Sequence, residues 1–390
     1  MTKQKETEKT TAKKSGKTVT KSPAKATINP ARKSPAKSAT NTNATAALVR
    51  RARPAVTLVT GGTGFLGSHI VRQLIEAGET GLRVLTTGAP PRWLTEAGVE
   101  VVTGSLTNAE DVRRAVAGAE NIYHLAGLVS RVSEDAHAMY ALHVDGTRVL
   151  CDAAREAGAQ NMVLASTSGT IAVTEKGEIV PDEDWPPPLD IFSRWPYYAS
   201  KFYQERVALE HFGGKGRRLI IVNPSLLLGP GDARLSATKV VLDFLARKIM
   251  AVPKGGLSFV DVRDAATALR AAMGRGRHGE RYLVGTVNWT FDEFFARLER
   301  LTKVSAPRLS LPSRLAVGGS HIVSTLYRHW KLAPPVQPAE IEMAEYFWYL
   351  DSSKAERELG FTPRDPQETL HETVAYVRVN FLGRRNAFVS

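Results

Sequence analysis

The sequence has very little cysteine and no long hydrophobic run. One cysteine, Cys151, occurs among 390 residues, so the chain cannot form an internal disulfide, and we expect a cytoplasmic protein in a reducing compartment. No stretch reaches the roughly 18 consecutive apolar residues that a transmembrane helix needs. The first residues also lack the apolar segment of a signal peptide, so we expect a chain without a transmembrane segment.

Acidic residues are scarce at the start of the chain. Residues 1–53 contain 14 Lys or Arg but only two acidic residues, Glu6 and Glu8, so nearly all of the net charge of +13 belongs to this segment. Residues 1–45 hold almost no large apolar side chains, and such a composition cannot bury enough surface to offset the entropy of ordering. We therefore expect residues 1–52 to form a disordered basic tail.

The tail contains an imperfect repeat, Lys-Ser-Pro-Ala-Lys at 21–25 and again at 33–37, which is similar to the tails of linker histones. Lysines spaced by prolines suit weak contacts with a polyanion, such as nucleic acid or an anionic lipid surface, through residues 1–53. The other interpretation is a solvated tail with no partner.

Short apolar runs alternate with helical patterns from residue 54 onwards. We expect strands at 56–60, 82–86, 99–102, 121–125 and 161–165, and one long helix from about 136 to 157. This alternation predicts an α/β fold with a doubly wound parallel sheet of the Rossmann type, whose ligands bind at the carboxyl ends of the strands. We assign residues 53–225 to a dinucleotide-binding domain with the catalytic residues. Residues 226–390 would form a smaller α/β substrate-binding region interleaved with it.

A glycine-rich turn follows the first strand, with glycines three residues apart at 61, 64 and 67. Such a turn lets a backbone amide approach a pyrophosphate, and the following helix offers its free amides to the phosphates. A glycine turn without a ligand is the alternative. The residues expected to contact the cofactor here are Gly61, Thr63, Gly64, Phe65, Leu66 and Gly67.

Tyr197 and Lys201 are four residues apart, so on a helix they lie on one face. A nearby ammonium favours the phenolate and lowers the pKa of a tyrosine, which makes Tyr197 a candidate general acid or base. The hydroxyl residues Ser166, Thr167 and Ser168 follow the strand at 161–165, and one of them could donate to a substrate oxygen or could instead cap the turn. Tyr203 has no lysine four residues on, and we interpret it as a packing residue.

Together these motifs resemble the extended and atypical short-chain dehydrogenase/reductases. Within them the chain is most similar to the dihydroflavonol-reductase-like and hopanoid-associated epimerase-like group of the NAD-dependent epimerase/dehydratases. The resemblance covers roughly residues 55–380. The segments that carry it are the Tyr197/Lys201 pair and residues 59–67, 123–127, 144–147, 222–232, 259–266, 279–285 and 351–363.

The resemblance implies a role for each matching residue. Tyr197 would relay the proton, and Lys201 would orient the nicotinamide ribose. Thr167 would be the catalytic hydroxyl, with Ser166 or Ser168 in its place if the match shifts by one residue. The residues implied to lie beside the cofactor are Leu125, Ala126, Gly127, Asn223, Pro224 and Ser225. No metal is implied, and a homodimer is expected by analogy.

Four positions depart from the pattern of this family. His143 stands where Asn is usual, Ser105 follows Gly104 where Asp is common, and Asp261 replaces a frequent His. The second strand ends in Thr86 with no acid to hold a ribose diol. Arg92 lies a few residues further on, so we expect NADP to be slightly favoured over NAD.

The segment after residue 224 is apolar, which is unusual for enzymes that act on nucleotide sugars. The aromatic and proline residues before Tyr197 could line an apolar pocket: Trp185, Phe192, Trp195 and the prolines at 186–188. We therefore favour reduction of a ketone or aldehyde, or oxidation of the alcohol, on a hydrophobic small molecule. The alternatives are an NAD-dependent nucleotide-sugar epimerase or dehydratase and a non-catalytic dinucleotide-binding regulator with a polyanion-binding tail.

Deletion of residues 1–50 tests whether the tail is an independent appendage. Because the tail has few large apolar residues that could join a core, the truncated chain should keep the melting temperature and the activity of the full chain. Differential scanning calorimetry and a turnover assay measure both. A large loss of either would show that the tail belongs to the folded domain.

Overall fold

The computed structural model describes residues 55–214, 216–309 and 337–383, and the structural statements below refer to these residues. The expected tail at 1–52 lies outside them, as do parts of the expected substrate-binding region. No helix in the described ranges is both long and apolar enough to cross a membrane.

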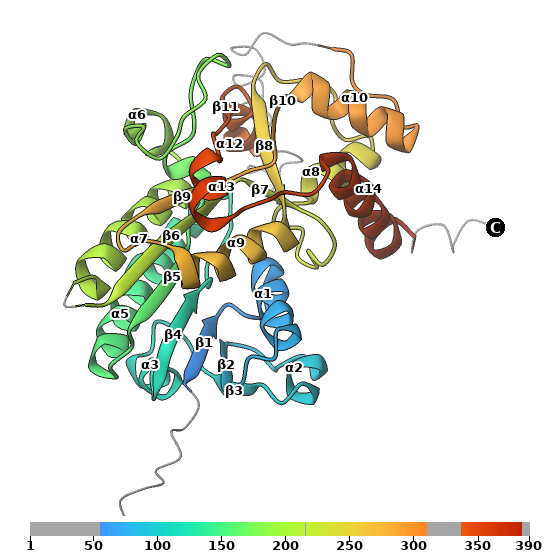
Figure 1. Cartoon of the computed structure of the whole chain (residues 1–390). Coiled ribbons are helices and arrows are strands. Elements are labelled where there is room, and N and C mark those ends of the chain that lie inside the picture. The colour runs from blue at the N-terminus through green and yellow to red at the C-terminus, as the bar shows by residue number, and fades with distance from the viewer. Residues whose placement is uncertain (1–54, 215, 310–336, 384–390) are drawn as a thin grey trace, which may run out of the picture. The chain divides into compact units, whose positions relative to one another are not determined.

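A parallel sheet of seven strands forms the centre of the fold (Figure 1), in the order β3-β2-β1-β4-β5-β6-β9. This order confirms the predicted doubly wound Rossmann sheet. Apart from the edge strand β3, these strands are mostly buried on both faces, which explains their largely apolar sequences. Their bounds are β1 (Val56–Thr60), β2 (Leu82–Thr86), β3 (Glu100–Thr103), β4 (Ala119–His124), β5 (Asn161–Ala165), β6 (Arg218–Pro224) and β9 (Arg281–Val284).

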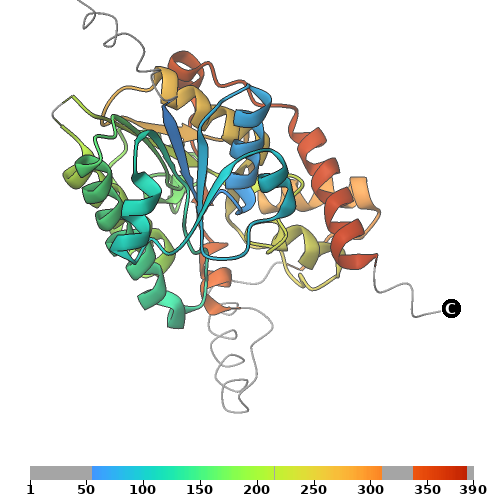
Figure 2. The same ribbon diagram turned by 90° about the horizontal axis from the view of Figure 1, so that it is seen from below.

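Helices cover both faces of this sheet (Figure 2). On one face α1 (Phe65–Glu76) packs against α9 (Val262–Arg275), and a core of side chains such as Val59 and Leu269 lies beneath them. On the other face α3 (Ala109–Val116), α5 (Gly146–Glu156) and α7 (Pro196–Phe212) enclose a second core. Each of these helices therefore buries its apolar side against one face of the sheet.

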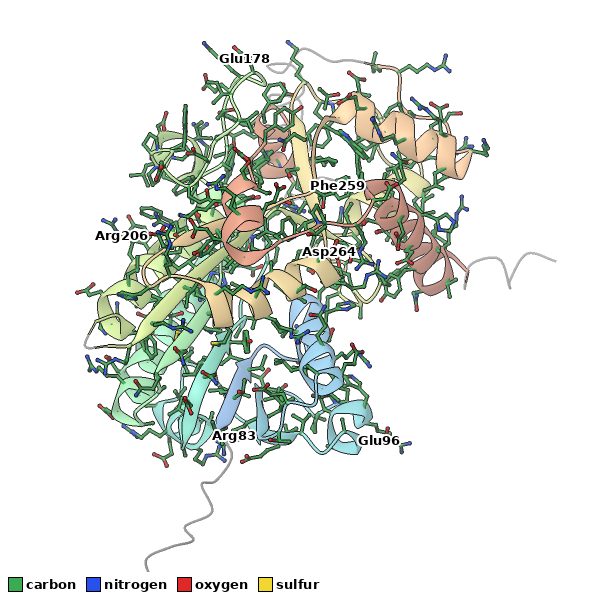
Figure 3. All side chains as sticks on the ribbon, viewed as in Figure 1. Arg83, Glu96, Glu178, Arg206, Phe259 and Asp264 are labelled. Carbon is green, nitrogen blue, oxygen red and sulfur yellow. The ribbon has the colours of Figure 1, made fainter. Side chains whose placement is uncertain are left out.

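A second, smaller sheet follows in the chain and consists of β7 (Leu226–Leu228), β8 (Gly256–Asp261), β10 (Val287–Thr290) and β11 (Phe347–Trp348). Phe259 on β8 (Figure 3) contacts Phe294 of α10 (Phe291–Thr302) and belongs to a core shared with α8 (Lys239–Leu245) and α14 (Pro366–Val377). The remaining helical elements are short. They are α2 (Arg92–Glu96), η1 (Ser133–Asp135), η3 (Ser168–Thr170), α6 (Leu189–Phe192), α12 (Pro338–Met343), α13 (Ser353–Leu359) and η4 (Arg378–Leu382).

The long helix expected at 136–157 is interrupted. It divides into α4 (Ala136–Tyr140), a π-helical turn η2 (Ala141–Asp145) and α5. Such turns insert an extra residue and often accompany functional sites. The π turn contains His143, whose side chain is fully buried.

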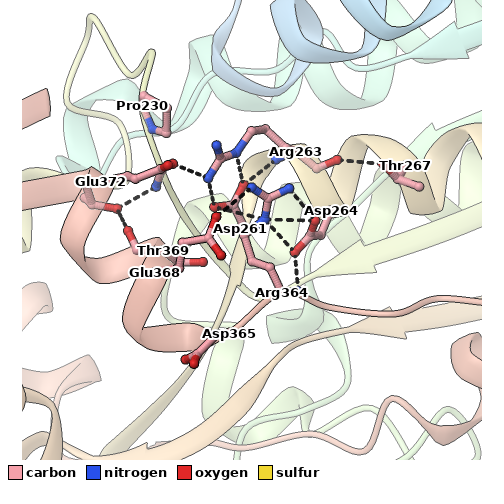
Figure 4. A network of polar contacts seen from close by, with 12 residues as sticks. Pro230, Asp261, Arg263, Asp264, Thr267, Arg364, Asp365, Glu368, Thr369 and Glu372 are labelled. Atoms are coloured by element: carbon pink, nitrogen blue, oxygen red, sulfur yellow. Dashed lines mark hydrogen bonds and ion pairs between the residues drawn. The ribbon is translucent and has the colours of Figure 1, made fainter. Parts of the chain in front are cut away.

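A network of ion pairs joins the C-terminal helix α14 to the start of α9 (Figure 4). Arg263 donates to Asp261 and pairs with Glu372, while Arg364 makes a bidentate contact with Asp264 at 2.9–3.1 Å. Asp261 is fully buried, and the Arg263 guanidinium beside it holds the pKa of that carboxyl low although burial opposes this. The aspartate that replaces the expected His at 261 therefore has its own cationic partner.

Substitution of Arg364 by Met tests the contribution of this network. The change leaves the buried Asp264 carboxylate without its bidentate partner, so the free energy of unfolding should fall by about 2–3 kcal/mol. Arg113→Met is the control, because Arg113 and its partner Glu110 are both exposed and such pairs contribute below about 0.5 kcal/mol. Equal effects of the two substitutions in urea unfolding would contradict this account.

Candidate active site

The turn between β1 and α1 is tightly packed against the loop after β4. Gly61 has φ +71°, and a Cβ there would lie 2.7–2.8 Å from backbone atoms of Leu125 and Ala126. A Cβ on Gly67 would lie 2.0 Å from the Gly61 carbonyl oxygen. Side chains are therefore excluded at both positions, as the sequence motif predicts.

The amino end of α1 suits an anion. Its N-cap is Gly64, no side chain caps the first turn, and no acidic residue occurs there. The amides of the first turn thus have no intrahelical partner, and the helix dipole favours a negative group beside them. Thr63, Phe65 and Leu66 are half-buried around this end. The arrangement fits the pyrophosphate of a dinucleotide.

The carboxyl end of β6 carries unpaired polar atoms. Asn223 Oδ1 and Ser225 Oγ are buried and have no hydrogen-bond partner within the described part of the chain. Buried polar atoms are rarely left unpaired in a complete structure. A group with both a donor and an acceptor, such as the carboxamide of nicotinamide, fits the two atoms. Pro224 lies between them on β6.

Tyr197 lies on the first turn of α7, and Thr167, two residues after the end of β5, is near enough to influence its phenol. Burial raises the pKa of Tyr197, and the nearby Tyr198 raises it further, whereas Arg131 and the Thr167 contact lower it. Of the three neighbouring hydroxyls, Ser166 instead donates to Glu205. Thr167 is therefore the hydroxyl that the fold brings to Tyr197.

Lys201 lies on the same helix, but its ammonium points elsewhere. Nζ donates to the Ala165 carbonyl at 2.7 Å and to Gln204 Oε1. Burial lowers the pKa of Lys201 to about 8, while Glu205 opposes the shift. The electrostatic effect on Tyr197 that we expected from Lys201 comes from Arg131. The four-residue spacing predicted that Tyr197 and Lys201 share one face of the helix, but it could not predict the direction in which the Lys201 ammonium points.

Glu205 was missed by the sequence analysis. Its carboxylate is fully buried on α7. It accepts hydrogen bonds from Ser166, Thr170 Oγ1 at 2.9 Å and Asn223 Nδ2 at 2.8 Å, and it pairs with Arg281 Nε at 2.9 Å. The available signal was its position four residues after Lys201, on the same helix face.

His143 is a neutral structural link. Its Nε2 accepts from the Leu128 amide at 3.0 Å, so Nδ1 carries the proton and donates to Ser200 Oγ at 2.8 Å. Burial, reinforced by the charge of Lys201, lowers the pKa of His143 to about 2. The ring lies edge-on to Tyr197 and next to Gly127. It therefore connects the loop after β4 to the helix that carries Tyr197.

The positions at which the sequence departs from the family pattern near the cofactor lie partly on the surface and partly in the core. Arg92 is exposed at the start of α2, and Thr86 is buried at the end of β2. The Asp111 carboxylate accepts from the Ser105 amide at 2.9 Å and occupies the space beside Gly104. No cluster of metal ligands occurs among residues 55–214, 216–309 and 337–383.

Two of the aromatic residues expected to line an apolar pocket belong to the hydrophobic core instead. Phe192 and Trp195 are almost fully buried and pack with Phe202 and Met343, so they cannot form an open pocket surface. Trp185 is exposed. The correction follows from packing, because large aromatic side chains before a helix serve a core as readily as a pocket.

Comparison with known proteins identifies the family. The model of the NAD dependent epimerase/dehydratase family matches residues 57–285. A Synechocystis protein provisionally named a dihydroflavonol 4-reductase is 31% identical over 322 residues, which cover 81% of this chain and 92% of that protein. Sterol demethylase protein B of Methylococcus capsulatus is 32% identical over 330 residues, or 83% and 98% of the two chains.

Among solved structures, the crystal structure of gox2253 is similar with a TM-score of 0.71 and 28% identity, over 84% of this chain and 98% of that one. The chain belongs to the NAD dependent epimerase/dehydratase family, which confirms the resemblance drawn from the motifs.

Glu205→Gln tests the role of the buried carboxylate. The amide nitrogen would face hydrogen-bond donors, so the free energy of unfolding should fall by about 2–4 kcal/mol. The matched control is Glu210→Gln, an exposed position on the same helix, which should change stability by less than about 0.5 kcal/mol. Urea unfolding followed by circular dichroism measures both variants, and an unchanged Glu205→Gln midpoint would refute the role.

Proposed function

We propose that the chain is an NAD(P)-dependent oxidoreductase that reduces a ketone or aldehyde, or oxidises the alcohol, of a hydrophobic small molecule. The observation that carries the proposal is the position of Tyr197, which starts α7 beside Thr167 at the carboxyl edge of the parallel sheet. The same edge presents the glycine turn and the unpaired atoms of Asn223 and Ser225. Membership of an NAD-dependent family supports the cofactor class, and Arg92 favours NADP over NAD.

Each side chain has a distinct task in this reaction. The dinucleotide, when bound, supplies or accepts the hydride. Tyr197 is held protonated by burial, so its phenol can donate a proton to the carbonyl oxygen as negative charge develops there. Thr167 donates or accepts at the same oxygen and keeps the phenol in place. Lys201, whose ammonium is held by the Ala165 carbonyl and Gln204, would offer its remaining N–H to a hydroxyl of the cofactor ribose.

An apolar substrate is supported by the aromatic side chains beside Tyr197. Tyr198 stacks on Trp348 at 4.8 Å, and Trp195 supports both rings from the core. Gly169 lies against the two stacked rings, where a Cβ would approach Tyr198 to 2.3 Å. The names of two relatives refer to a sterol and to a dihydroflavonol, which are ring compounds of this general kind.

A nucleotide-sugar epimerase is the second candidate, because the family description names epimerases and dehydratases. The segment β7 argues against it, since its sequence Leu-Leu-Leu offers no polar side chain to a diphosphate.

Tyr197→Phe is the direct test of the chemistry. Removal of the phenolic hydroxyl should reduce turnover by about 10²–10⁴-fold, while the Kd for NADPH stays within a few-fold. Tyr203→Phe serves as the control, because Tyr203 is half-exposed on the same helix and should retain activity. Steady-state kinetics with a panel of apolar ketones measures both variants. An active Tyr197→Phe enzyme would rule out the mechanism.

A further inference from the structure

Five buried polar side chains form a continuous chain of hydrogen bonds from Lys201 to the glycine turn. Four of them are fully buried and Lys201 is 5% exposed. Lys201 donates to Gln204 Oε1, Gln204 Nε2 contacts Thr147 Oγ1 at 2.9 Å, and Thr147 contacts His124 Nε2 at 2.8 Å. His124 Nδ1 then contacts Thr60 Oγ1 at 2.8 Å.

The ammonium of Lys201 determines which atom donates and which accepts at each step of this chain. An ammonium only donates, so the Gln204 carbonyl oxygen must face it and the Gln204 amide nitrogen must donate at the other end. The nitrogen lies 3.2 Å from His124 Nε2, which therefore accepts. Burial and the charge of Lys201 lower the pKa of His124 to about 3, so the ring is neutral and carries its proton on Nδ1, toward Thr60.

The far end of the chain touches both walls of the dinucleotide crevice. Thr60 is the last residue of β1 and directly precedes Gly61. Its hydroxyl also accepts from the Ala126 amide at 3.2 Å, in the loop that packs against Gly61. The position of Lys201 is thus connected to the backbone on either side of the pyrophosphate turn.

The Lys201 ammonium retains one unused donor. Two of its three hydrogens are taken by Ala165 and Gln204, and the third has no partner among the described residues. Burying an ammonium is unfavourable unless acceptors surround it. Two fixed acceptors keep the charge in place and leave one N–H for an incoming hydroxyl.

We infer that Gln204, supported by Thr147 and His124, is a positioning residue that holds the Lys201 ammonium for the cofactor ribose and connects it to the pyrophosphate turn. The inference rests on the proposed function in naming the ribose as the ligand. The hydrogen-bond chain itself exists without any ligand.

The titration of Lys201 reports this arrangement directly. The ionisable groups that face it are Glu205 from its own helix, His124 from β4 and His143 from the π turn, and both histidines are neutral. Burial lowers the pKa of Lys201 to about 8, below that of a free lysine. Loss of the Gln204 acceptor disfavours the charged form and lowers this pKa further, whereas a carboxylate at the same place raises it.

The experiment compares Gln204→Leu and Gln204→Glu in the full chain with lysines labelled at Cε. NMR titration without cofactor follows Lys201, whose signal is assigned with a Lys201→Met spectrum. We expect the midpoint to move down by about one pH unit in Gln204→Leu and up by a similar amount in Gln204→Glu. Gln160→Leu is the control, since Gln160 is exposed and its side chain hydrogen-bonds, among the described residues, only to the Gly158 carbonyl. Unchanged midpoints in both Gln204 variants would overturn the inference.

A second readout separates this inference from the proposed function. NADPH titration followed by nicotinamide fluorescence should show about ten-fold weaker binding to Gln204→Leu and no change for Gln160→Leu. Equal affinities would overturn the connection to the ribose. If the wild-type chain binds neither NADPH nor NADH, the proposed function is wrong, and the NMR midpoints alone decide whether Gln204 positions Lys201. Gln204→Glu is nearly isosteric, so it keeps the test valid if Gln204→Leu fails to fold.

Discussion

The buried carboxylate of Glu205 is the interaction on which the site depends. It joins α7 to three other segments: the turn after β5 through Ser166 and Thr170, the end of β6 through Asn223, and β9 through Arg281. A buried carboxylate is stable only when such donors surround it, so the segments hold one another in register. Tyr197 and Thr167 belong to two of these segments, so the same arrangement places both residues at the carboxyl edge of the sheet.

Two buried networks meet on α7, with different consequences. The Glu205 network fixes the helix against the strand ends, whereas the chain through Gln204 and His124 runs from Lys201 to the glycine turn. His143 adds a third link, from the loop after β4 to Ser200. Because the participating histidines are neutral at physiological pH, these links keep their donors and acceptors over the range in which the enzyme would work.

The sequence predicted the parts that depend on local pattern. The strands Val56–Thr60, Leu82–Thr86 and Asn161–Ala165 have the expected bounds, because buried parallel strands have apolar runs that end at turn residues. The packing of Gly61 and Gly67 also follows from spacing alone. The π turn, the direction of the Lys201 ammonium and the roles of Gln204 and Glu205 could not be predicted, since each depends on partners distant in the chain. The burial of Phe192 and Trp195 in the core could not be predicted either, because composition does not distinguish residues that line a pocket from residues packed behind them.

The central claim is that the carboxyl edge of the sheet binds a nicotinamide dinucleotide for carbonyl chemistry. A titration of the chain with NADPH, NADH and a set of nucleotide sugars, followed by nicotinamide fluorescence and heat, tests it most directly. We expect the chain to bind NADPH in preference to NADH and to show no response to the sugars. Tightly retained NAD with a clear nucleotide-sugar response would instead indicate an epimerase, and the absence of any dinucleotide binding would contradict the account altogether.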